Sequence, residues 1–326
     1  MSENSAIEWC DATWNPVLGC AKVSEGCRGC YAIPQAWMKQ SNPGAKVREA
    51  YSGLVEKRPD GSLNWTGRVN LVPERLPLPL TWKKSKRIFV NSLSDLFHEA
   101  VPDEYIDRVF AVMALAQHHT FQVLTKRPER MAAYLKSATR ANAIGSTAVT
   151  FAEDMGMEWD FYYSWGRRVD GIPCWPLPNV WLGVSVEETL GCAWRITELQ
   201  RTPAAVRFVS AEPLIGPLDL SPYLGACRRC DGTGIMVIVY LRTNYGRCDV
   251  CQGTGRVSLD WVIAGGESGP RHRPLDLDWA RSLRDQCVAA GVAFHFKQVG
   301  GRTPKANGRE LDGRTWDEFP QIGGAS

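Results

Sequence analysis

The sequence lacks long hydrophobic runs and has almost no excess of charge of either sign. No stretch of about 18 apolar residues occurs, which excludes a transmembrane helix of ordinary length. The first residues, Met1-Ser2-Glu3-Asn4, lack the basic and apolar regions of a secretory signal. We therefore expect a cytoplasmic protein without a membrane partner. A formal net charge of +3 neither requires nor excludes a nucleic-acid partner.

Apart from one local duplication described below, the chain also lacks a repeated unit of fixed period, which argues against a solenoid. Hydrophobic residues make up 44% and charged residues 22% of its 326 positions, as is ordinary for a folded globular protein. This length suits one large α/β domain with insertions or two ordinary domains. Most of the 11 cysteines fall in two tight clusters, which favours metal ligation over disulfides.

Six short β-rich segments, each followed by a helix-like stretch, organise the chain. They cover residues 87–90, 120–124, 180–186, 206–210, 261–264 and 292–296. Near-continuous apolar runs such as Ile88-Phe89-Val90 are typical of parallel strands that are covered on both faces. Pro102, followed by Asp103 and Glu104, predicts the start of a helix after the first strand. We expect an α/β fold that forms a partial TIM-type (β/α) barrel.

Three stretches lack this alternation of strand and helix, and we interpret them as irregular insertions on the barrel. They cover residues 40–82, rich in Pro, Gly and Arg, residues 141–179, rich in aromatics, and residues 226–256, bounded by cysteine pairs. We therefore divide the chain into a first barrel part at 1–225, a small insertion at 226–256 and a last barrel part at 257–326.

Polar or charged residues follow each of the six predicted strands. In parallel β/α folds the reactive residues gather at the carboxyl ends of the strands, because the loops there are free to vary. A single such residue is as often a helix cap as a site residue, but six strand ends together indicate a shared pocket. The candidates are Asn91, Ser94, Asp95, Lys126, Arg127, Ser185, Glu187, Glu212, Glu267 and Lys297.

Three cysteines near the N-terminus, Cys20, Cys27 and Cys30, share one short loop. Three thiolates can bind three irons of a [4Fe-4S] cluster and leave the fourth iron open to a cofactor or substrate. The alternative is a zinc ion held by the same three thiolates, with Cys10 or a histidine as the fourth ligand.

A duplicated C-x2-C-x-G-T-G unit forms the second cysteine cluster. Its cysteines, Cys227, Cys230, Cys248 and Cys251, can supply a tetrahedral zinc site. The unit resembles the cysteine-rich zinc units of DnaJ-type chaperones, and a structural role is expected because the protein fills all four positions. A second iron–sulfur cluster is the alternative. Arginines and tyrosines between the cysteine pairs favour contact with a nucleic-acid backbone.

Ordered motifs along the chain resemble one known family. They are the segment from Ile7-Glu8-Trp9 through Cys30-Tyr31-Ala32, Ser94-Asp95-Leu96-Phe97-His98-Glu99, Leu124-Thr125-Lys126-Arg127-Pro128, Gly183-Val184-Ser185-Val186-Glu187, Ser210-Ala211-Glu212-Pro213-Leu214, Ala264-Gly265-Gly266-Glu267-Ser268-Gly269 and Phe296-Lys297-Gln298. From about residue 7 to about residue 320 the chain is similar to the phage and prophage "three-Cys motif" proteins, which are related to radical SAM enzymes of the spore photoproduct lyase type. Its cluster loop departs from the common C-x3-C-x2-C spacing by a longer segment between Cys20 and Cys27.

The resemblance implies a barrel of the radical SAM type that binds a [4Fe-4S] cluster and S-adenosylmethionine. An external one-electron donor would start the formation of a 5′-deoxyadenosyl radical, which would modify a nucleic-acid base in DNA or a modified nucleotide. Some phage members are implicated as isomerases of amino-acid adducts on hypermodified thymidine. The resemblance also implies a phage or prophage gene expressed in a bacterial host.

The resemblance further implies roles for the strand-end residues. Ser94 and Asp95 would hold the methionine amine, Lys126 or Arg127 would pair with the carboxylate, and Ser185 and Glu187 would contact the ribose. Asn91 is a further cofactor-binding candidate. Lys297, Glu267 and Glu212 are interpreted as catalytic or substrate-contacting. Two other functions stay open: a non-catalytic zinc protein that binds nucleic acid, and a radical SAM enzyme that acts on a free nucleotide or peptide. The sequence does not define the oligomeric state.

Overall fold

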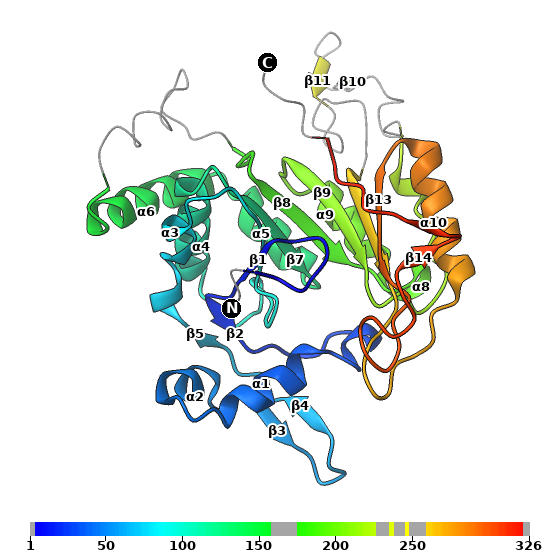
Figure 1. The fold of residues 1–326 in the computed structure, drawn as a ribbon. Helices are drawn as coiled ribbons and strands as arrows, with labels where there is room; N and C mark the ends of the chain where they lie inside the picture. Colours follow the sequence, from blue (N-terminus) through cyan, green and yellow to red (C-terminus); the bar gives the residue numbers. More distant parts are fainter. Residues whose placement is uncertain (1–3, 158–174, 226–234, 238–244, 248–258, 322–326) are drawn as a thin grey trace. The chain divides into compact units, whose positions relative to one another are not determined.

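The computed structural model describes residues 4–157, 175–225, 235–237, 245–247 and 259–321 (Figure 1). Its main feature is a seven-stranded sheet with the strand order β1-β6-β7-β8-β9-β12-β13. These strands span Ala12–Trp14, Arg87–Val90, Thr120–Thr125, Val180–Ser185, Val206–Ala211, Trp261–Gly265 and Ala293–Gln298. Every pairing of these strands that has a defined register is parallel.

This sheet confirms the α/β fold and all six predicted strands. Neighbouring strands follow one another in the sequence, which is compatible with a partial TIM-type barrel. The remaining strand, β1, is three residues long, and its apolar pattern is too short to stand out in the sequence.

Contacts within the chain divide the protein into two compact units, which are described separately below. Unit 1 comprises residues 1–182 and 203–205, and unit 2 comprises residues 183–202 and 206–326.

Unit 1 contains the strands β1, β6 and β7 and three of the longer helices. The helices are α4 (Asp103–Leu115), α5 (Pro128–Lys136) and α6 (Arg140–Asp154). Helix α4 begins where predicted, with Pro102 at its N-cap and two acidic residues in its first turn. The first part of the stretch 141–179 was wrongly expected to be irregular, because residues up to Asp154 belong to α6. Small residues of α6, Ala148 and Ala152, pack against α4 and explain this helix.

The stretch 40–82 was also wrongly expected to be irregular. Together with the segment before it, this part of unit 1 contains η1 (Glu25–Cys27), α1 (Ala32–Gln40), α2 (Ala45–Tyr51), β3 (Val55–Lys57), β4 (Leu63–Trp65), η2 (Pro73–Arg75), α3 (Leu78–Thr81) and the paired strands β2 (Val17–Leu18) and β5 (Asn70–Leu71). The β3–β4 turn contains Asp60-Gly61, with Gly61 at a φ of 81°. An Asp-Gly turn is a known hairpin signal, so the sequence held a clue to this element.

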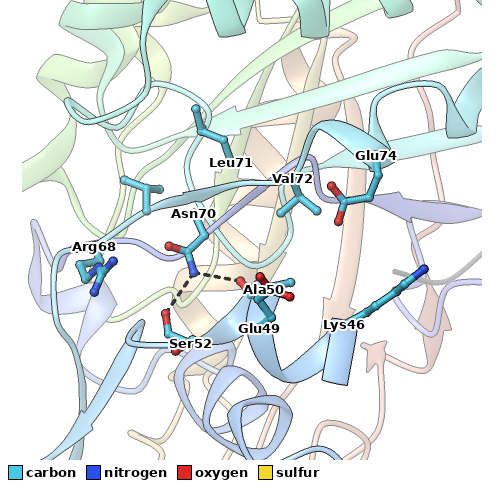
Figure 2. A pocket seen from close by; sticks show the side chains of 10 residues that line it. Lys46, Glu49, Ala50, Ser52, Arg68, Asn70, Leu71, Val72 and Glu74 are labelled. Atoms are coloured by element: carbon cyan, nitrogen blue, oxygen red, sulfur yellow. Dashed lines mark hydrogen bonds between the residues drawn. The ribbon is translucent and has the colours of Figure 1, made fainter. Parts of the chain in front are cut away.

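A cavity of about 660 Å³ lies between α2, β5 and the segment that follows β5 (Figure 2). Charged side chains of both signs line it, namely Lys46, Glu49, Arg68 and Glu74. The side-chain amide of Asn70 donates to two backbone carbonyl oxygens at the end of α2, at 3.0 and 3.1 Å. This amide fixes β5 to α2 and so maintains the cavity wall.

Unit 2 contains β9, β12 and β13 with the helices α8 (Thr189–Cys192), α9 (Trp194–Gln200) and α10 (Leu277–Ala290). It also contains η3 (Ser221–Tyr223) and the hairpin of β14 (Glu310–Leu311) and β15 (Arg314–Thr315). Helix α10 begins at the side-chain cap of Asp276 and ends at Gly291, which has a φ of 65°. Within the insertion 226–256, β10 (Ile235–Val237) pairs antiparallel with β11 (Tyr245–Arg247). In the described ranges, no helix combines the length and the apolar character that a membrane span requires.

Gly183 allows close packing between β8 and the Phe208 ring. A Cβ atom at Gly183 would lie 2.4 Å from that ring, which is buried. Gly183→Ala should therefore lower the free energy of unfolding by about 1–3 kcal/mol through overpacking. Urea denaturation of the full chain measures this change. Gly191→Ala is the matched control, since its Cβ would meet its nearest neighbour at 3.4 Å. Equal stabilities of the two variants would contradict the packing argument.

Candidate functional site

The cysteine loop of unit 1 is fastened to the loop that follows β6. Gly19 and Ser94 form a parallel β-bridge, and the Ser94 hydroxyl donates to the carbonyl oxygen of Val17 at 2.7 Å. The hydroxyl of Tyr31, just after the third cysteine, donates to the carbonyl oxygen of Ser92 at 2.7 Å. The two loops are thus held together at both ends of the cysteine segment.

Only glycine fits directly before Cys20. Gly19 has a φ of 91°, a conformation that other residues rarely adopt. A Cβ atom there would lie 2.3 Å from the carbonyl oxygen of Arg68 and 2.7 Å from Leu54 Cδ2. The backbone of the cysteine loop therefore lies directly against the segment before β5.

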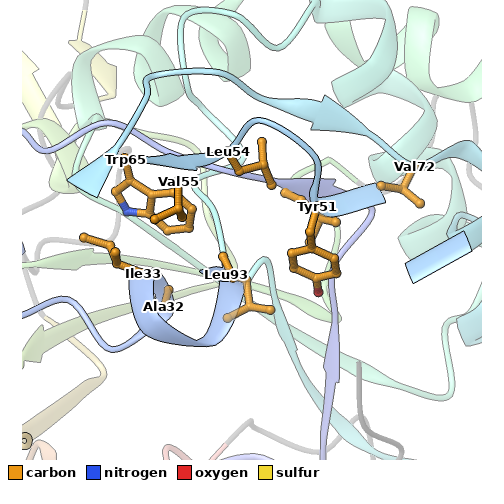
Figure 3. Close-up of a cluster of buried hydrophobic side chains, with 10 residues drawn as sticks. Ala32, Ile33, Tyr51, Leu54, Val55, Trp65, Val72 and Leu93 are labelled. Atoms are coloured by element: carbon orange, nitrogen blue, oxygen red, sulfur yellow. The ribbon is translucent and has the colours of Figure 1, made fainter. Parts of the chain in front are cut away.

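A small hydrophobic core supports the cysteine loop (Figure 3). Cys20 and Cys30 pack against it while remaining partly exposed. The core consists of Leu18, Ala32, Ile33, Ala36, Tyr51, Leu54, Val55, Trp65, Val72 and Leu93. Half of these residues come from the stretch 40–82, which was expected to be irregular, so this insertion contributes to the base of the cysteine loop.

The Asp95 carboxylate organises the ends of β6 and β7. Its Oδ1 accepts hydrogen bonds from the backbone N–H of Phe97 at 3.0 Å and the Thr125 hydroxyl at 2.7 Å. Its Oδ2 accepts from the backbone N–H of Lys126 at 3.0 Å and from Arg127 Nη1 at 3.2 Å. Asp95 is buried, and four protein donors surround its carboxylate. In the structure this side chain holds two strand-end loops together.

Arg127 connects these strand ends to the cysteine loop. Its Nη1 donates to Cys20 Sγ at 3.7 Å, and its Nη2 donates to the carbonyl oxygen of Ala21 at 3.3 Å. Its Nε donates to Glu99 Oε1 at 3.0 Å, in addition to the contact with Asp95. Arg127 is only 8% exposed, so it is a fixed charge next to Cys20.

Cys20, Cys27 and Cys30 are free thiols that influence one another electrostatically. Burial raises the pKa of Cys20 to about 12, the charge of Asp95 acts in the same direction, and Arg127 acts in the opposite direction. Burial also raises the pKa of Cys30, and Lys126 opposes that increase. Ionisation of Cys30 would raise the pKa of Cys20, and ionisation of Cys27 would raise that of Cys30. Positive charge placed among these thiols would therefore favour their thiolate forms.

The donor set of this loop fits an iron–sulfur cluster. Cysteine thiolates are the usual ligands of such clusters, and three of them suffice for three irons. Across the described ranges, no three His, Cys, Asp or Glu side chains are gathered closely enough to hold one metal ion. The sulfur ligands of a [4Fe-4S] cluster bind different irons, so they do not converge on a single point. The loop offers three separate thiols for such a group.

Asn91 occupies an unusual position at the end of β6. Its φ is 61°, and its Oδ1 accepts from the backbone N–H of Val17 at 3.4 Å. Its buried Nδ2 has no hydrogen-bond partner among the described residues. A buried amide donor without a partner is costly, so this nitrogen is a candidate contact for a ligand.

In unit 2, Glu187 and Ser185 share one buried partner. Arg195 Nη1 donates to Glu187 Oε2 at 2.9 Å and to the carbonyl oxygen of Ser185 at 2.8 Å. All three residues are buried. Arg195 was not identified from the sequence, where nothing marks an arginine in a helix as the partner of a strand-end acid.

The other two predicted acids of unit 2 are also paired. Lys297 Nζ lies 2.9 Å from Glu212 Oε1, and a Cβ atom at Gly265 would lie 2.9 Å from the same oxygen. Glu267 accepts from Arg273 through both carboxylate oxygens, at 2.9 Å each. The Lys297 and Glu212 side chains remain 19% and 13% exposed, whereas Glu267 is 6% exposed. The Lys297–Glu212 pair is thus the more accessible of the two.

A family model described as "Protein of unknown function (DUF5131)" matches residues 4–320. The chain belongs to the DUF5131 family. No curated protein and no solved structure matches it. The matched range includes both cysteine clusters and all the strand ends described above.

In this DUF5131 chain the structure brings the predicted residues together within each unit. Unit 1 joins Asp95 and Arg127 to the cysteine loop, and unit 2 joins Glu212 to Lys297. Cys227, Cys230, Cys248 and Cys251 lie outside the described residues. Glu99 was part of a quoted motif but received no role from the sequence, since only the fold shows its contact with Arg127.

Asp95→Asn should lower the free energy of unfolding by roughly 3 kcal/mol, because the substitution breaks a buried ion pair and turns an amide N–H toward existing donors. Chemical denaturation followed by tryptophan fluorescence measures the effect. Asp154→Asn, at an exposed carboxylate at the end of α6, is the control and should change stability little. If both variants unfolded at the same denaturant concentration, Asp95 would not have the anchoring role described.

His295 makes the stability of the protein depend on pH. Burial lowers its pKa from 6.5 to about 4, with Arg309 and Lys297 acting in the same direction and Asp317 and Glu212 opposing them. The unfolded chain therefore binds a proton before the folded chain does. Stability should fall as the pH decreases from about 6.5 to about 4, by at most about 3 kcal/mol. His295→Phe should remove this part of the pH dependence in denaturation curves, and an unchanged slope would contradict it.

Proposed function

We propose that the chain is a radical SAM enzyme that modifies a nucleic-acid base, with Cys20, Cys27 and Cys30 as the ligands of a [4Fe-4S] cluster. The observation that carries this proposal is the loop of three free thiols, held at the strand ends and flanked by the cations Arg127 and Lys126. Three thiolates need compensating positive charge in a partly buried loop, and the adjacent cations contribute to it.

When bound, the cluster and S-adenosylmethionine would supply a 5′-deoxyadenosyl radical and methionine, using one electron from an external donor, and the radical would take a hydrogen atom from the substrate. The chain itself would position these groups and exclude water. The hydrophobic core beneath the cysteine loop supports both tasks, because Cys20 and Cys30 pack against it.

The contacts of unit 1 favour particular cofactor roles. Arg127 already uses donors on all three of its nitrogens, so Lys126 is the better partner for the methionine carboxylate. Asp95 accepts four hydrogen bonds inside the protein, and its role is to hold the site. The buried amide of Asn91 is then the preferred contact for the cofactor. Ribose contacts of Ser185 and Glu187 stay a prediction.

The Lys297–Glu212 pair is the proposed substrate contact. A half-buried ammonium can bind a phosphate or carboxylate of the substrate, and Glu212 can hold the ammonium in place or accept its proton. We place Glu267 in a positioning role, since both of its oxygens bind Arg273. The four cysteines of the insertion are proposed to hold zinc; in the sequence, the antiparallel hairpin of β10 and β11 lies between the two cysteine pairs. Isomerisation of a thymidine adduct and a phage origin remain parts of this proposal.

Anaerobic reconstitution with iron and sulfide tests the assignment. The full chain should become brown, show the spectrum of a [4Fe-4S] cluster, and convert S-adenosylmethionine to 5′-deoxyadenosine when dithionite is added. Cys27→Ala should lose both properties. Cys10→Ala is the matched control: Cys10 Sγ donates to the Ser5 hydroxyl at 3.2 Å, and it was the alternative fourth ligand for zinc. Stoichiometric zinc in the wild-type loop, lost in both variants, would overturn the proposal.

A further inference from the structure

The hydrogen bond from Arg127 to Cys20 Sγ affects more than the position of the cysteine loop. We propose that Arg127 is a positioning residue that raises the reduction potential of the cluster by donating to Cys20 Sγ. This inference rests on the proposed function, because it requires a cluster at Cys20. It assigns to Arg127 a role in electron uptake instead of the carboxylate contact expected from the sequence.

The position of Arg127 is fixed from several directions. Asp95 binds Nη1 at 3.2 Å, Glu99 binds Nε at 3.0 Å, and the carbonyl oxygen of Ala21 binds Nη2 at 3.3 Å. The backbone N–H of Arg127 also donates to the Thr125 hydroxyl at 2.8 Å. A guanidinium with these partners cannot swing toward solvent, so its Nη1 stays directed at the sulfur.

The sign of the effect follows from charge. Reduction adds one negative charge to a group that already carries thiolate ligands, and a nearby fixed cation stabilises the more negative state. An N–H donor to the ligating sulfur acts in the same direction, because hydrogen bonds to sulfur tune the potentials of such sites. Arg127 is 8% exposed, so solvent screens its charge only weakly.

Glu99 provides an opposing charge that can be removed separately. Its carboxylate lies 3.0 Å from Arg127 Nε, yet its side chain is 70% exposed. Neutralising Glu99 should leave the buried contacts in place and expose the cysteine loop to more of the positive charge of Arg127. The potential should then rise, opposite to the effect of removing Arg127.

The test is a redox titration of the reconstituted full chain, followed by electron paramagnetic resonance of the reduced cluster. Arg127→Gln should make reduction at least tenfold less favourable, a decrease of about 59 mV in midpoint potential. Glu99→Gln should shift the potential upward. Glu129→Gln is the matched control, because it removes an exposed carboxylate in the first turn of α5 and should leave the potential unchanged.

The possible outcomes distinguish a failure of this inference from a failure of the proposed function. Wild-type protein without a cluster would refute the proposed function itself. A cluster whose potential is the same in wild type, Arg127→Gln and Glu99→Gln would overturn the role of Arg127 and leave the proposed function intact. If Arg127→Gln failed to retain a cluster, Glu99→Gln would decide: an upward shift supports the inference, and no shift overturns it. If Arg127 had a purely structural role, Arg127→Gln would change the amount of bound cluster. Arg127→Gln and Glu99→Gln would then not shift the midpoint potential in opposite directions.

Discussion

The buried pair of Asp95 and Arg127 is the interaction on which the proposed cofactor site depends. Two charges removed from water are tolerated only when each has close partners of opposite charge and further hydrogen bonds. Asp95 obtains four donors and Arg127 obtains acceptors on three nitrogens. These partners come from the loop after β6, the end of β7 and the cysteine loop. The pair thus joins three segments that are distant in the sequence.

Unit 2 repeats this arrangement with other residues. Glu187 pairs with Arg195, Glu212 with Lys297, and Glu267 with Arg273. Each of these strand-end acids is therefore paired with a basic side chain of the same unit. The Glu212–Lys297 pair differs in its greater exposure and in using lysine, whose compact ammonium is free to rotate. This difference is why the proposed substrate contact is placed there.

The insertion between α1 and β6 explains how the cysteine loop can have a defined geometry. A loop has high conformational entropy unless other elements order it. Here a compact hydrophobic core lies against Cys20 and Cys30, and Gly19 allows the backbone to lie against Arg68. The last residues between Cys20 and Cys27 belong, together with Cys27, to the short helix η1.

The sequence alone determined six of the seven strands of the sheet and the residues at their ends, because short runs rich in apolar residues followed by polar residues are a local signal. It also determined the grouping of Cys20, Cys27 and Cys30, which is a matter of spacing. It did not reveal the elements of residues 40–82 or α6, whose short segments are stabilised by packing against other parts of unit 1. Only the tertiary structure decided which partner each charged residue takes: Arg127 binds Cys20 and Asp95, and Arg195 binds Glu187. These choices depend on long-range contacts, since a buried charge is stabilised by whichever opposite charge the fold brings within a few ångströms.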